Sequence, residues 1–238
     1  MSATGCRQVH GFTLAELLVV VSIIALLMSL LAPSLTRAQR QAEQVHCLAN
    51  QRQLTLAWIQ YAGDHGDRLC DPDSFTSLLQ PYTRQIKEVY VCKGIQDRSV
   101  SNSYGLSNTL AGEARDDVKP YVKLHHVTRP SEKMAFVDVE LRSSTCFWPV
   151  LRSEGQWIWR PWSWPPWASL QGMTARHSNG CNMTFADGHV AYYRWSDGRT
   201  IGLIKGLIAD PSQASSENAD LEYVVRILTH PPGPSDGR

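Results

Sequence analysis

The residues of this chain best suited to chemistry gather near its C-terminal end. His177 is followed, after nine residues, by Asp187 and Gly188, and His189 comes next. Two imidazoles and a carboxylate are donors that could bind zinc or a harder cation, or could support hydrolysis. The apolar runs flanking Asp187-Gly188 instead favour a β-hairpin over 177–193, with a two-residue type I′ loop. A third interpretation is that assembly machinery recognises this hairpin.

The three polar residues lack further support for a metal or catalytic site. No cysteine or glutamate stands at ligand spacing from them, and no Cys-x-x-Cys pair occurs in the chain. The sequence also contains no nucleophile elbow and no phosphate-binding loop. We therefore expect no catalytic residue, no metal and no cofactor, and a protein that is not an enzyme.

The composition argues against nucleic acid as a partner. The chain of 238 residues carries 23 Lys and Arg against 22 Asp and Glu, for a net charge of +1. Binding of nucleic acid depends on clustered positive charge, which this balance does not indicate. An apolar content of 43 % is sufficient for a core, and the length fits one or two small domains.

An apolar segment near the N-terminus predicts a membrane helix. It begins at Phe12, continues to Ala32 and is interrupted only by Glu16. As a helix it would be about 30 Å long, which is the thickness of a bilayer core. It is too long for an ordinary signal peptide and lacks a small-x-small cleavage site. A plain signal anchor would leave Glu16 unexplained, because a carboxylate inside a membrane is costly and usually functional.

The residues around Glu16 form a recognisable pattern. Residues 11–19, with the sequence GFTLAELLV, resemble the cleavage and methylation motif of type IV prepilins and type II secretion pseudopilins. The resemblance implies that a prepilin peptidase cuts between Gly11 and Phe12 and that the new amine of Phe12 is N-methylated. It also implies that Glu16 pairs with the N-terminal amine of a neighbouring subunit during assembly in the inner membrane.

The apolar segment continues into a second helical stretch. Pro33 is expected to kink the helix. Beyond it, residues 36–61 contain no Gly or Pro and repeat apolar residues at helical spacing. We expect one helix of about 50 residues and an α+β, pilin-like fold in which this helix packs on a small antiparallel sheet. The expected organisation is a leader (1–11), a transmembrane half-helix (12–35), an amphipathic half-helix (36–62), a β-rich head (63–230) and a disordered tail (231–238).

Three further segments carry a second resemblance. Residues 47–54 (CLANQRQL), 103–108 (SYGLSN) and the His177-to-Gly188 signature resemble a planctomycete-type family of pilin-like proteins with a C-terminal H-x9-D-G pattern. Cleavage after Gly11 would remove Cys6 and leave five cysteines, an odd number: Cys47, Cys70, Cys92, Cys146 and Cys181. The resemblance implies a disulfide between Cys47 and Cys92, which both match family positions.

A segment rich in tryptophan and proline, expected to be an insertion over 146–170, has no counterpart in that family. Six tryptophans lie between Trp148 and Trp167. They either fill the core of the head or form an exposed surface for a partner subunit or a carbohydrate. The candidate binding surface consists of Trp157, Trp159, Trp162 and Trp164.

The expected function is that of a structural subunit in a type IV pilus-like or type II secretion pseudopilus-like fibre. Its partners would be a prepilin peptidase, other pilin or pseudopilin subunits and the bacterial inner membrane, which it would cross once with its head on the periplasmic or extracytoplasmic side. An alternative is a membrane-tethered module that binds glycans or proteins and uses the pilin N-terminus for export. An anchored hydrolase would require the His177/Asp187 site to be real.

Overall fold

The structure is a computed structural model that describes residues 13–95, 100–111, 119–139, 146–147, 150–153, 156–159, 173–205, 207–208 and 211–228. The chain divides into two compact units, Met1–Ala42 and Glu43–Arg238. Gly11, Phe12, Trp148, Trp162, Trp164, Trp167 and the tail 231–238 lie outside the described residues.

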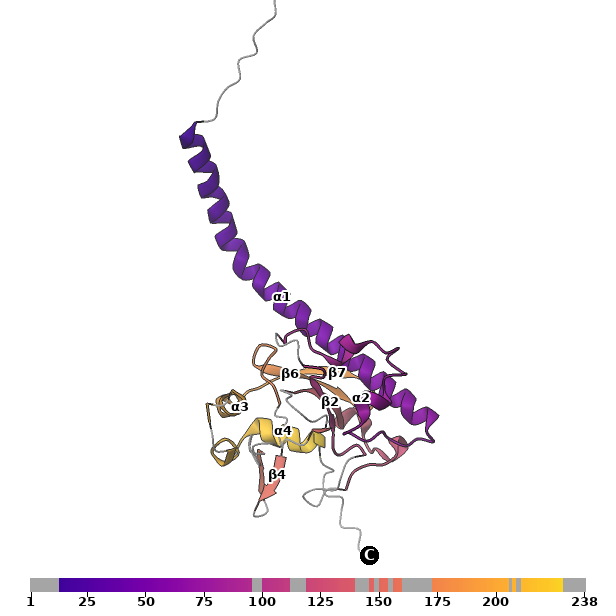
Figure 1. Cartoon of the computed structure of the whole chain (residues 1–238). Helices are drawn as coiled ribbons and strands as arrows, with labels where there is room; N and C mark the ends of the chain where they lie inside the picture. Colours follow the sequence, from indigo (N-terminus) through magenta and orange to yellow (C-terminus); the bar gives the residue numbers. More distant parts are fainter. Residues whose placement is uncertain are drawn as a thin grey trace, which may run out of the picture. The chain divides into compact units, whose positions relative to one another are not determined.

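One helix, α1 (Leu14–Asp64), runs through 51 residues (Figure 1). This confirms the prediction of a single long helix that begins in the apolar segment and ends near Gly63. Pro33 lies inside α1, and the helix continues beyond it. The predicted kink at that residue stays a prediction.

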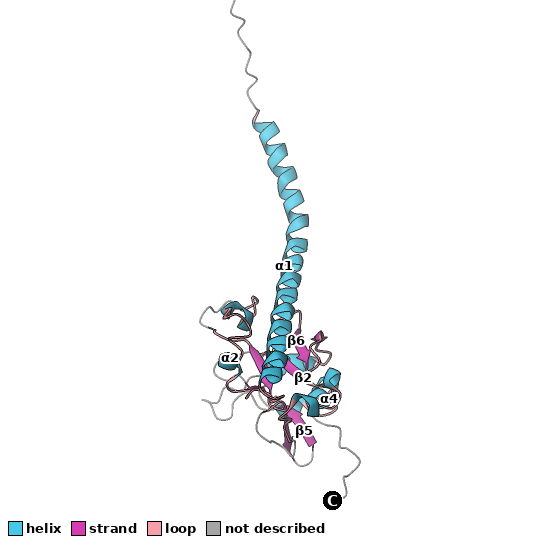
Figure 2. Ribbon diagram, turned by 90° about the vertical axis from the view of Figure 1, so that its right-hand side faces the viewer, coloured by secondary structure: helices cyan, strands magenta, loops and turns pink. Residues whose placement is uncertain are grey.

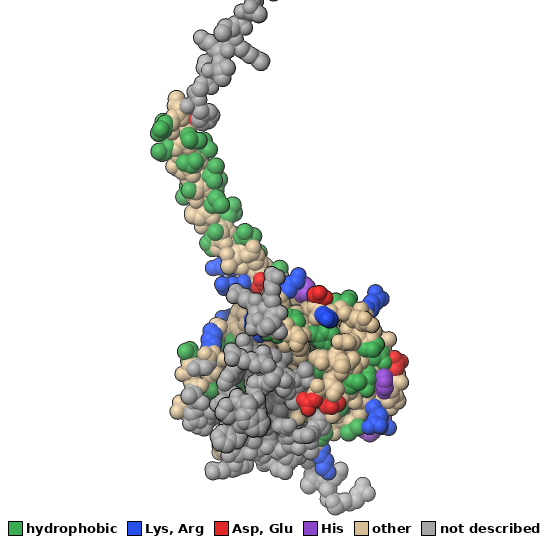
Figure 3. Space-filling view, in the orientation of Figure 1, with side chains coloured by type: hydrophobic (Ala, Val, Ile, Leu, Met, Phe, Trp, Pro, Cys, Tyr) green, Lys and Arg blue, Asp and Glu red, His purple; other side chains and the backbone are tan. Residues whose placement is uncertain are grey.

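The first unit presents the apolar part of α1. Its large apolar side chains from Leu14 to Leu35 are exposed, and Figure 3 shows them in green along this part of the helix. Polar hydroxyls in this stretch bond to the helix backbone: Ser22 Oγ donates to Leu18 O at 2.7 Å, and Ser29 Oγ donates to Leu26 O at 2.7 Å. Such bonds satisfy hydroxyl groups in lipid. Among the described residues, α1 is the helix long and apolar enough to cross a membrane.

The second unit is built on a five-stranded sheet with the order β3-β1-β2-β6-β7. Four strands are antiparallel neighbours, and the short β3 pairs parallel to β1 at one edge. Figure 2 shows the strands beside the C-terminal half of α1. Their bounds are Tyr104–Ser107 (β1), Met134–Asp138 (β2), Cys146–Phe147 (β3), Gly180–Phe185 (β6) and Val190–Arg194 (β7). This confirms the predicted α+β fold.

The sheet separates two apolar clusters. On one side, Leu54 and Trp58 of α1 pack with Phe75, Tyr104 and Phe136. On the other, α4 (Ala219–Leu228) presents Leu221, Val224 and Ile227 to a cluster that also contains Val137, Met183 and Trp195. The C-terminal half of α1 and the helix α4 therefore cover opposite faces of the sheet, which is the layered arrangement that buries both faces.

Short elements complete the head. They are α2 (Phe75–Leu78), η1 (Lys87–Tyr90), η2 (Leu124–His126), η3 (Pro130–Glu132), β4 (Val150–Ser153), β5 (Gln156–Trp159), α3 (Gly198–Ile204) and η4 (Pro211–Ala214). Residues 89–92 (VYVC) are rich in β-forming side chains, yet η1 covers the first half of this run. Tertiary contact outweighs the β propensity here, because the Asn50 side chain donates to the carbonyl oxygens of Glu88 (3.0 Å) and Val91 (3.3 Å).

The turn at Asp187-Gly188 differs from the predicted type I′ loop. Strand pairing ends at Thr184–Val190, Gly188 N donates to Phe185 O at 2.9 Å, and only Gly188 of the pair has a positive φ, of 90°. The loop is therefore a type I turn followed by a left-handed glycine, which is the usual three-residue hairpin connection. The prediction of two positive-φ residues at this position was wrong.

Gly188 offers a direct test of this turn. We expect Gly188→Ala to lower the free energy of unfolding by about 1–2 kcal/mol, because an L side chain is strained in the left-handed region. Denaturant unfolding of the full chain in detergent, followed by tryptophan fluorescence, measures the change.

Gly63→Ala is the matched control. Gly63 lies in α1 with no atom within 4 Å of an added Cβ and without a positive φ. The control should leave stability unchanged or raise it by roughly 0.5–1 kcal/mol. Equal effects of the two substitutions would contradict the assigned turn.

Candidate functional site: a buried polar seam

Three polar residues on the buried face of α1 stand four residues apart. Cys47, Gln51 and Thr55 each have no exposed surface. Residues at this spacing lie above one another on one helix face. Polar groups facing them are Cys92, Asp138, His177, Asn182 and Thr184, which are also buried. We call these eight residues the polar seam.

At one end of the seam two hydroxyl groups join the helix to the sheet. Thr55 Oγ1 donates to Thr184 Oγ1 at 2.7 Å, and Phe136 N donates to the same Thr184 oxygen at 3.0 Å. Thr55 Oγ1 also lies 2.9 Å from the Gln51 carbonyl oxygen. Because both hydroxyl groups are bonded, their burial carries little of the penalty that unpaired polar groups have.

The centre of the seam is the carboxyl group of Asp138, at the end of β2. Gln51 Nε2 donates to its Oδ1 at 2.9 Å, and Asn182 N donates to its Oδ2 at 3.0 Å. Burial raises the pKa of Asp138 to about 6, although the Asn182 and Gln51 donors and the positive charge of Arg176 act in the opposite direction. The helix α1, β2 and β6 thus meet at one carboxyl group.

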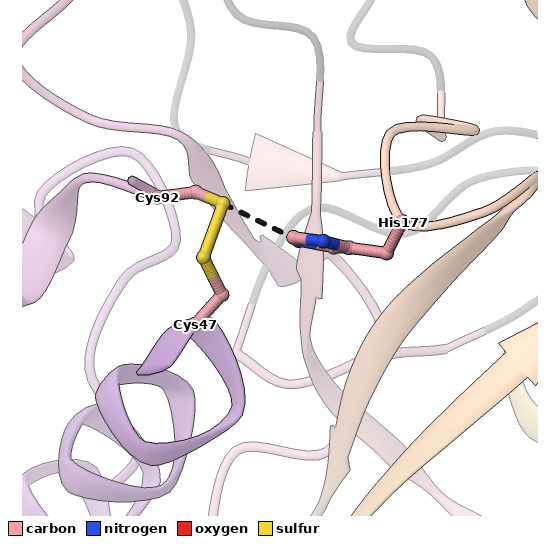
Figure 4. Close-up of side chains that lie close together, drawn as sticks. All are labelled: Cys47, Cys92 and His177. Carbon is pink, nitrogen blue, oxygen red and sulfur yellow. Dashed lines mark hydrogen bonds between the residues drawn. A yellow bond between two sulfur atoms is a disulfide. The ribbon is translucent and has the colours of Figure 1, made fainter. Parts of the chain in front are cut away.

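At the other end, a disulfide joins Cys47 of α1 to Cys92, with the two Cα atoms 5.2 Å apart (Figure 4). His177 Nε2 lies 3.3 Å from Cys92 Sγ and 3.4 Å from Asp138 Oδ2. Burial, with a smaller contribution from Arg176, lowers the pKa of His177 to about 4. The pairing that the family resemblance implied is the one present in the structure.

A tight turn directly after His177 positions its imidazole. Ser178 and Asn179 have positive φ values of 52° and 61°, and Gly180 N donates to His177 O at 3.0 Å. A type I′ turn therefore lies here, and not at Asp187-Gly188. A Cβ on Gly180 would stand 2.3 Å from Tyr193 O, so only glycine fits at this position. Tyr192 Oη also donates to His177 O at 2.6 Å.

His177, Asp187 and His189, which we weighed as a metal or catalytic site, do not come together. His177 precedes β6 and Asp187 follows it, and a strand of six residues is roughly 20 Å long at ~3.3 Å per residue. Asp187 Oδ1 instead accepts from His189 N at 3.1 Å and lies 2.6 Å from His189 Nδ1. The His189 ring stacks on Phe185, with centroids 4.2 Å apart. The two ends of the signature have separate structural roles.

Two of the tryptophans considered for binding lie in the described part of the chain. Trp159 is 4 % exposed, packs edge-on against Trp195, and donates its backbone N–H to Ser215 Oγ at 2.9 Å. Trp157 is half-buried against the same cluster. The indole of Trp159 is therefore a core group, and the pair does not form an exposed aromatic surface.

The remaining described cysteines with a placed side chain are buried free thiols. Burial raises the pKa of Cys70 to about 12, and it raises that of Cys181 well above its ordinary value. Reactive thiols are exposed and have a lowered pKa. Cys70 and Cys181 therefore act as apolar packing groups.

The N-terminal turn of α1 gives Glu16 a bonding partner within its own chain. Thr13 N donates to Glu16 Oε2 at 2.9 Å, and Glu16 N donates to Thr13 Oγ1 at 3.2 Å. This reciprocal pair is a capping box, which satisfies two backbone donors at a helix start. The sequence carried the T-x-x-E signal for it.

Gln51 tests the centre of the seam. We expect Gln51→Leu to lower the free energy of unfolding by about 2 kcal/mol, because it removes a donor from a buried carboxyl group. Its neighbour Gln53 is exposed, and Gln53→Leu should change stability by less than about 0.5 kcal/mol. Denaturant unfolding of both variants decides the matter, and equal losses would contradict the role given to Gln51.

Opposing pKa shifts at Asp138 and His177 predict a pH signature. In the folded, oxidised protein the pKa values are about 6 for Asp138 and about 4 for His177, against roughly 4 and 6.5 in an unfolded chain. Between pH 4 and 6 the pair therefore binds one proton in both states and adds no slope to stability. The neighbouring Cys181 and Tyr104 titrate far above this range because burial raises their pKa values.

Replacing one of these two residues should reveal the pH dependence of stability that the other causes. Asp138→Asn leaves His177, whose lowered pKa makes stability rise with pH between about 4 and 6.5. His177→Phe leaves Asp138, whose raised pKa makes stability fall between about 4 and 6. In each variant the slope of the unfolding free energy against pH should reach about 1.4 kcal/mol per pH unit, the value for one proton. Unfolding curves recorded with chelator and without reductant check this, and two unchanged pH profiles would contradict it.

Comparison with known proteins identifies the N-terminal segment. Residues 6–32 match the prokaryotic N-terminal methylation motif. No curated protein and no solved structure matches the chain. The motif is that of pilin-like proteins processed by a prepilin peptidase. Together with the apolar helix α1, it supports a membrane-anchored, exported protein with a pilin-like architecture.

Proposed function

We propose that this protein is a structural subunit of a type IV pilus-like or type II secretion pseudopilus-like fibre. The observation that carries the proposal is the methylation motif at the head of a helix whose apolar side chains are exposed over residues 14–35. An exposed apolar helix needs an apolar partner, which is the bilayer before assembly and other subunits afterwards.

Glu16 is the residue proposed to guide assembly. Cleavage before Phe12 would create a positive amine four residues from Glu16 along the chain. A carboxylate in apolar surroundings is stabilised by a positive partner. Within a single chain Thr13 satisfies the Glu16 carboxylate, and in a fibre the methylated amine of a neighbouring subunit would take that place.

The head is proposed to be a rigid cap on the C-terminal half of α1. The polar seam and the disulfide hold this half of the helix against the sheet. A catalytic role finds no support among the described residues, because His177 is buried beside the disulfide and Asp187 is bonded to His189.

The proposed function is tested by processing and assembly. Expressed with a prepilin peptidase and a fibre assembly system, the mature chain should begin at Phe12 and carry one added methyl group, as measured by mass spectrometry. Glu16→Gln should be cleaved but recovered in the membrane and not in sheared fibres, because its neutral side chain cannot pair with an amine.

Glu43→Gln is the matched control, since Glu43 is an exposed carboxylate elsewhere on α1. This variant should enter fibres like the wild type. A mature protein that starts at Met1, or Glu16→Gln chains present in fibres at wild-type yield, would refute the proposal.

A further inference from the structure

Three donor atoms converge at the disulfide end of the polar seam, and a fourth lies beside one of them. Cys47 Sγ, Cys92 Sγ and His177 Nε2 all lie within 4.8 Å of one another (Figure 4). Asp138 Oδ2 lies 3.4 Å from the same His177 nitrogen. These are two sulfurs, one imidazole nitrogen and one carboxylate oxygen, each of a type that zinc binds.

We propose that Cys47, Cys92, His177 and Asp138 form a zinc site when the disulfide is reduced. Zinc bonds of ~2.0–2.3 Å place the ligand atoms of a tetrahedral site roughly 3.3–3.8 Å apart. The distances from His177 Nε2 to Cys92 Sγ (3.3 Å) and to Asp138 Oδ2 (3.4 Å) already have this spacing. Reduction permits the two sulfurs to separate, and the Asp138 carboxylate, which is not part of the group of atoms within 4.8 Å, has to move closer to them.

The surroundings orient the ligands as a metal site requires. Gln51 Nε2 donates to Asp138 Oδ1, which leaves Oδ2 as the oxygen near His177. Tyr192 Oη and the turn after His177 fix the backbone that carries the imidazole. Groups that bond to the ligands, and not to the metal itself, orient the ligands and tune the metal site.

The same part of the core holds polar atoms that lack a protein partner. Gln51 Oε1 and both side-chain amide atoms of Asn182 are buried without a hydrogen bond to protein, and both residues have no exposed surface. Buried polar atoms are normally satisfied by protein, water or an ion. Gln51 and Asn182 are also the two residues that donate hydrogen bonds to the Asp138 carboxyl group.

A nearby cation balances the charge of the occupied site. Zinc with two thiolates and one carboxylate has a net charge of −1. The guanidinium of Arg176 acts electrostatically on both Asp138 and His177, and its Nη2 donates to Val139 O at 3.3 Å. A buried charge is tolerated when it is paired in this way.

The site lies close to the protein surface. Cys92 is followed by exposed Lys93 and half-exposed Gly94, and a Cβ on Gly94 would stand 3.6 Å from Cys92 Sγ. The segment next to Cys92 Sγ therefore reaches the protein surface. Two soft thiolates and an imidazole also favour zinc over calcium or magnesium, which prefer oxygen ligands.

The conversion balances with a phosphine as the reductant. The phosphorus atom gives two electrons to the disulfide and is oxidised to the phosphine oxide, and water supplies the oxygen and two protons that yield two thiols. Zn²⁺ then displaces both thiol protons to the buffer and binds the two thiolates. Helix α1 thereby stays cross-linked to Cys92 in oxidising and in reducing surroundings.

Cobalt binding tests the proposal, because tetrahedral cobalt reports thiolate ligands by colour. The full chain in detergent is reduced with a phosphine, freed of reductant and metal without air, and titrated with Co²⁺. We expect one equivalent to bind with a sulfur-to-cobalt charge-transfer band and strong visible bands, and Zn²⁺ to abolish both. The oxidised chain should bind none.

Variants identify the ligands. Cys47→Ser/Cys92→Ser should lose the charge-transfer band, whereas Cys181→Ala, which removes a buried thiol outside the site, should keep it. Gln51→Leu should keep the band and weaken binding roughly 10–100-fold, as loss of an outer-shell partner does. His177→Ala should weaken binding at least as much.

Three results would overturn the proposal. The first is a reduced wild type whose cobalt spectrum equals that of the double serine variant, and the second is a cobalt affinity that does not depend on His177. The third applies if reduction loosens the head. In that case Zn²⁺ must restore the near-ultraviolet circular dichroism of the oxidised protein, and a failure to restore it refutes the site.

Discussion

Packing of α1 on the sheet depends on one buried carboxyl group, that of Asp138. It has no exposed surface, and its two oxygens accept from the Gln51 side chain and the Asn182 backbone. Burying a carboxyl group without partners would cost several kcal/mol of folding free energy. Helix α1 therefore has to place a hydrogen-bond donor opposite Asp138. Apolar contacts alone would permit α1 to shift along the sheet, whereas the bond from Gln51 favours one register. The His177 imidazole and the Thr55–Thr184 pair support the same register on either side.

The H-x9-D-G signature has two structural roles at the two ends of one strand. His177 stands at the disulfide, where α1 meets the sheet. At the other end, an added Cβ on Gly188 would lie 3.7 Å from Ile59 Cδ1 and 3.9 Å from Leu56 Cδ2, so the turn lies against α1 a few turns further along. The spacing of the signature thus matches the length of β6 and its two contacts with α1. A hairpin with a different number of residues could not make both contacts.

Local patterns in the sequence predicted much of the fold, and contacts between distant residues account for the rest. The long helix and the hairpin of β6 and β7 follow from apolar periodicity and turn residues. The loop types did not follow, because Ser178-Asn179 takes the type I′ turn only with Gly180 packed against Tyr193. Gln51 was not predicted as a site residue, since the importance of its amide depends on Asp138, 87 residues away. The residues of the proposed zinc site come from positions 47, 92, 138 and 177, so no short ligand motif marks them.

The place of the disulfide has a mechanical consequence. Cys47 is the first buried residue along α1, and it is covalently bound to Cys92. A force that pulls on α1 from its N-terminal side therefore reaches the head at a covalent bond before it loads any hydrogen bond of the seam. Peeling the helix from the sheet, residue by residue from that side, would require rupture of a sulfur–sulfur bond. Tension applied from that side therefore passes through the Cys47–Cys92 bond into the backbone at Cys92, and the part of α1 beyond Cys47 stays on the sheet while the disulfide is intact.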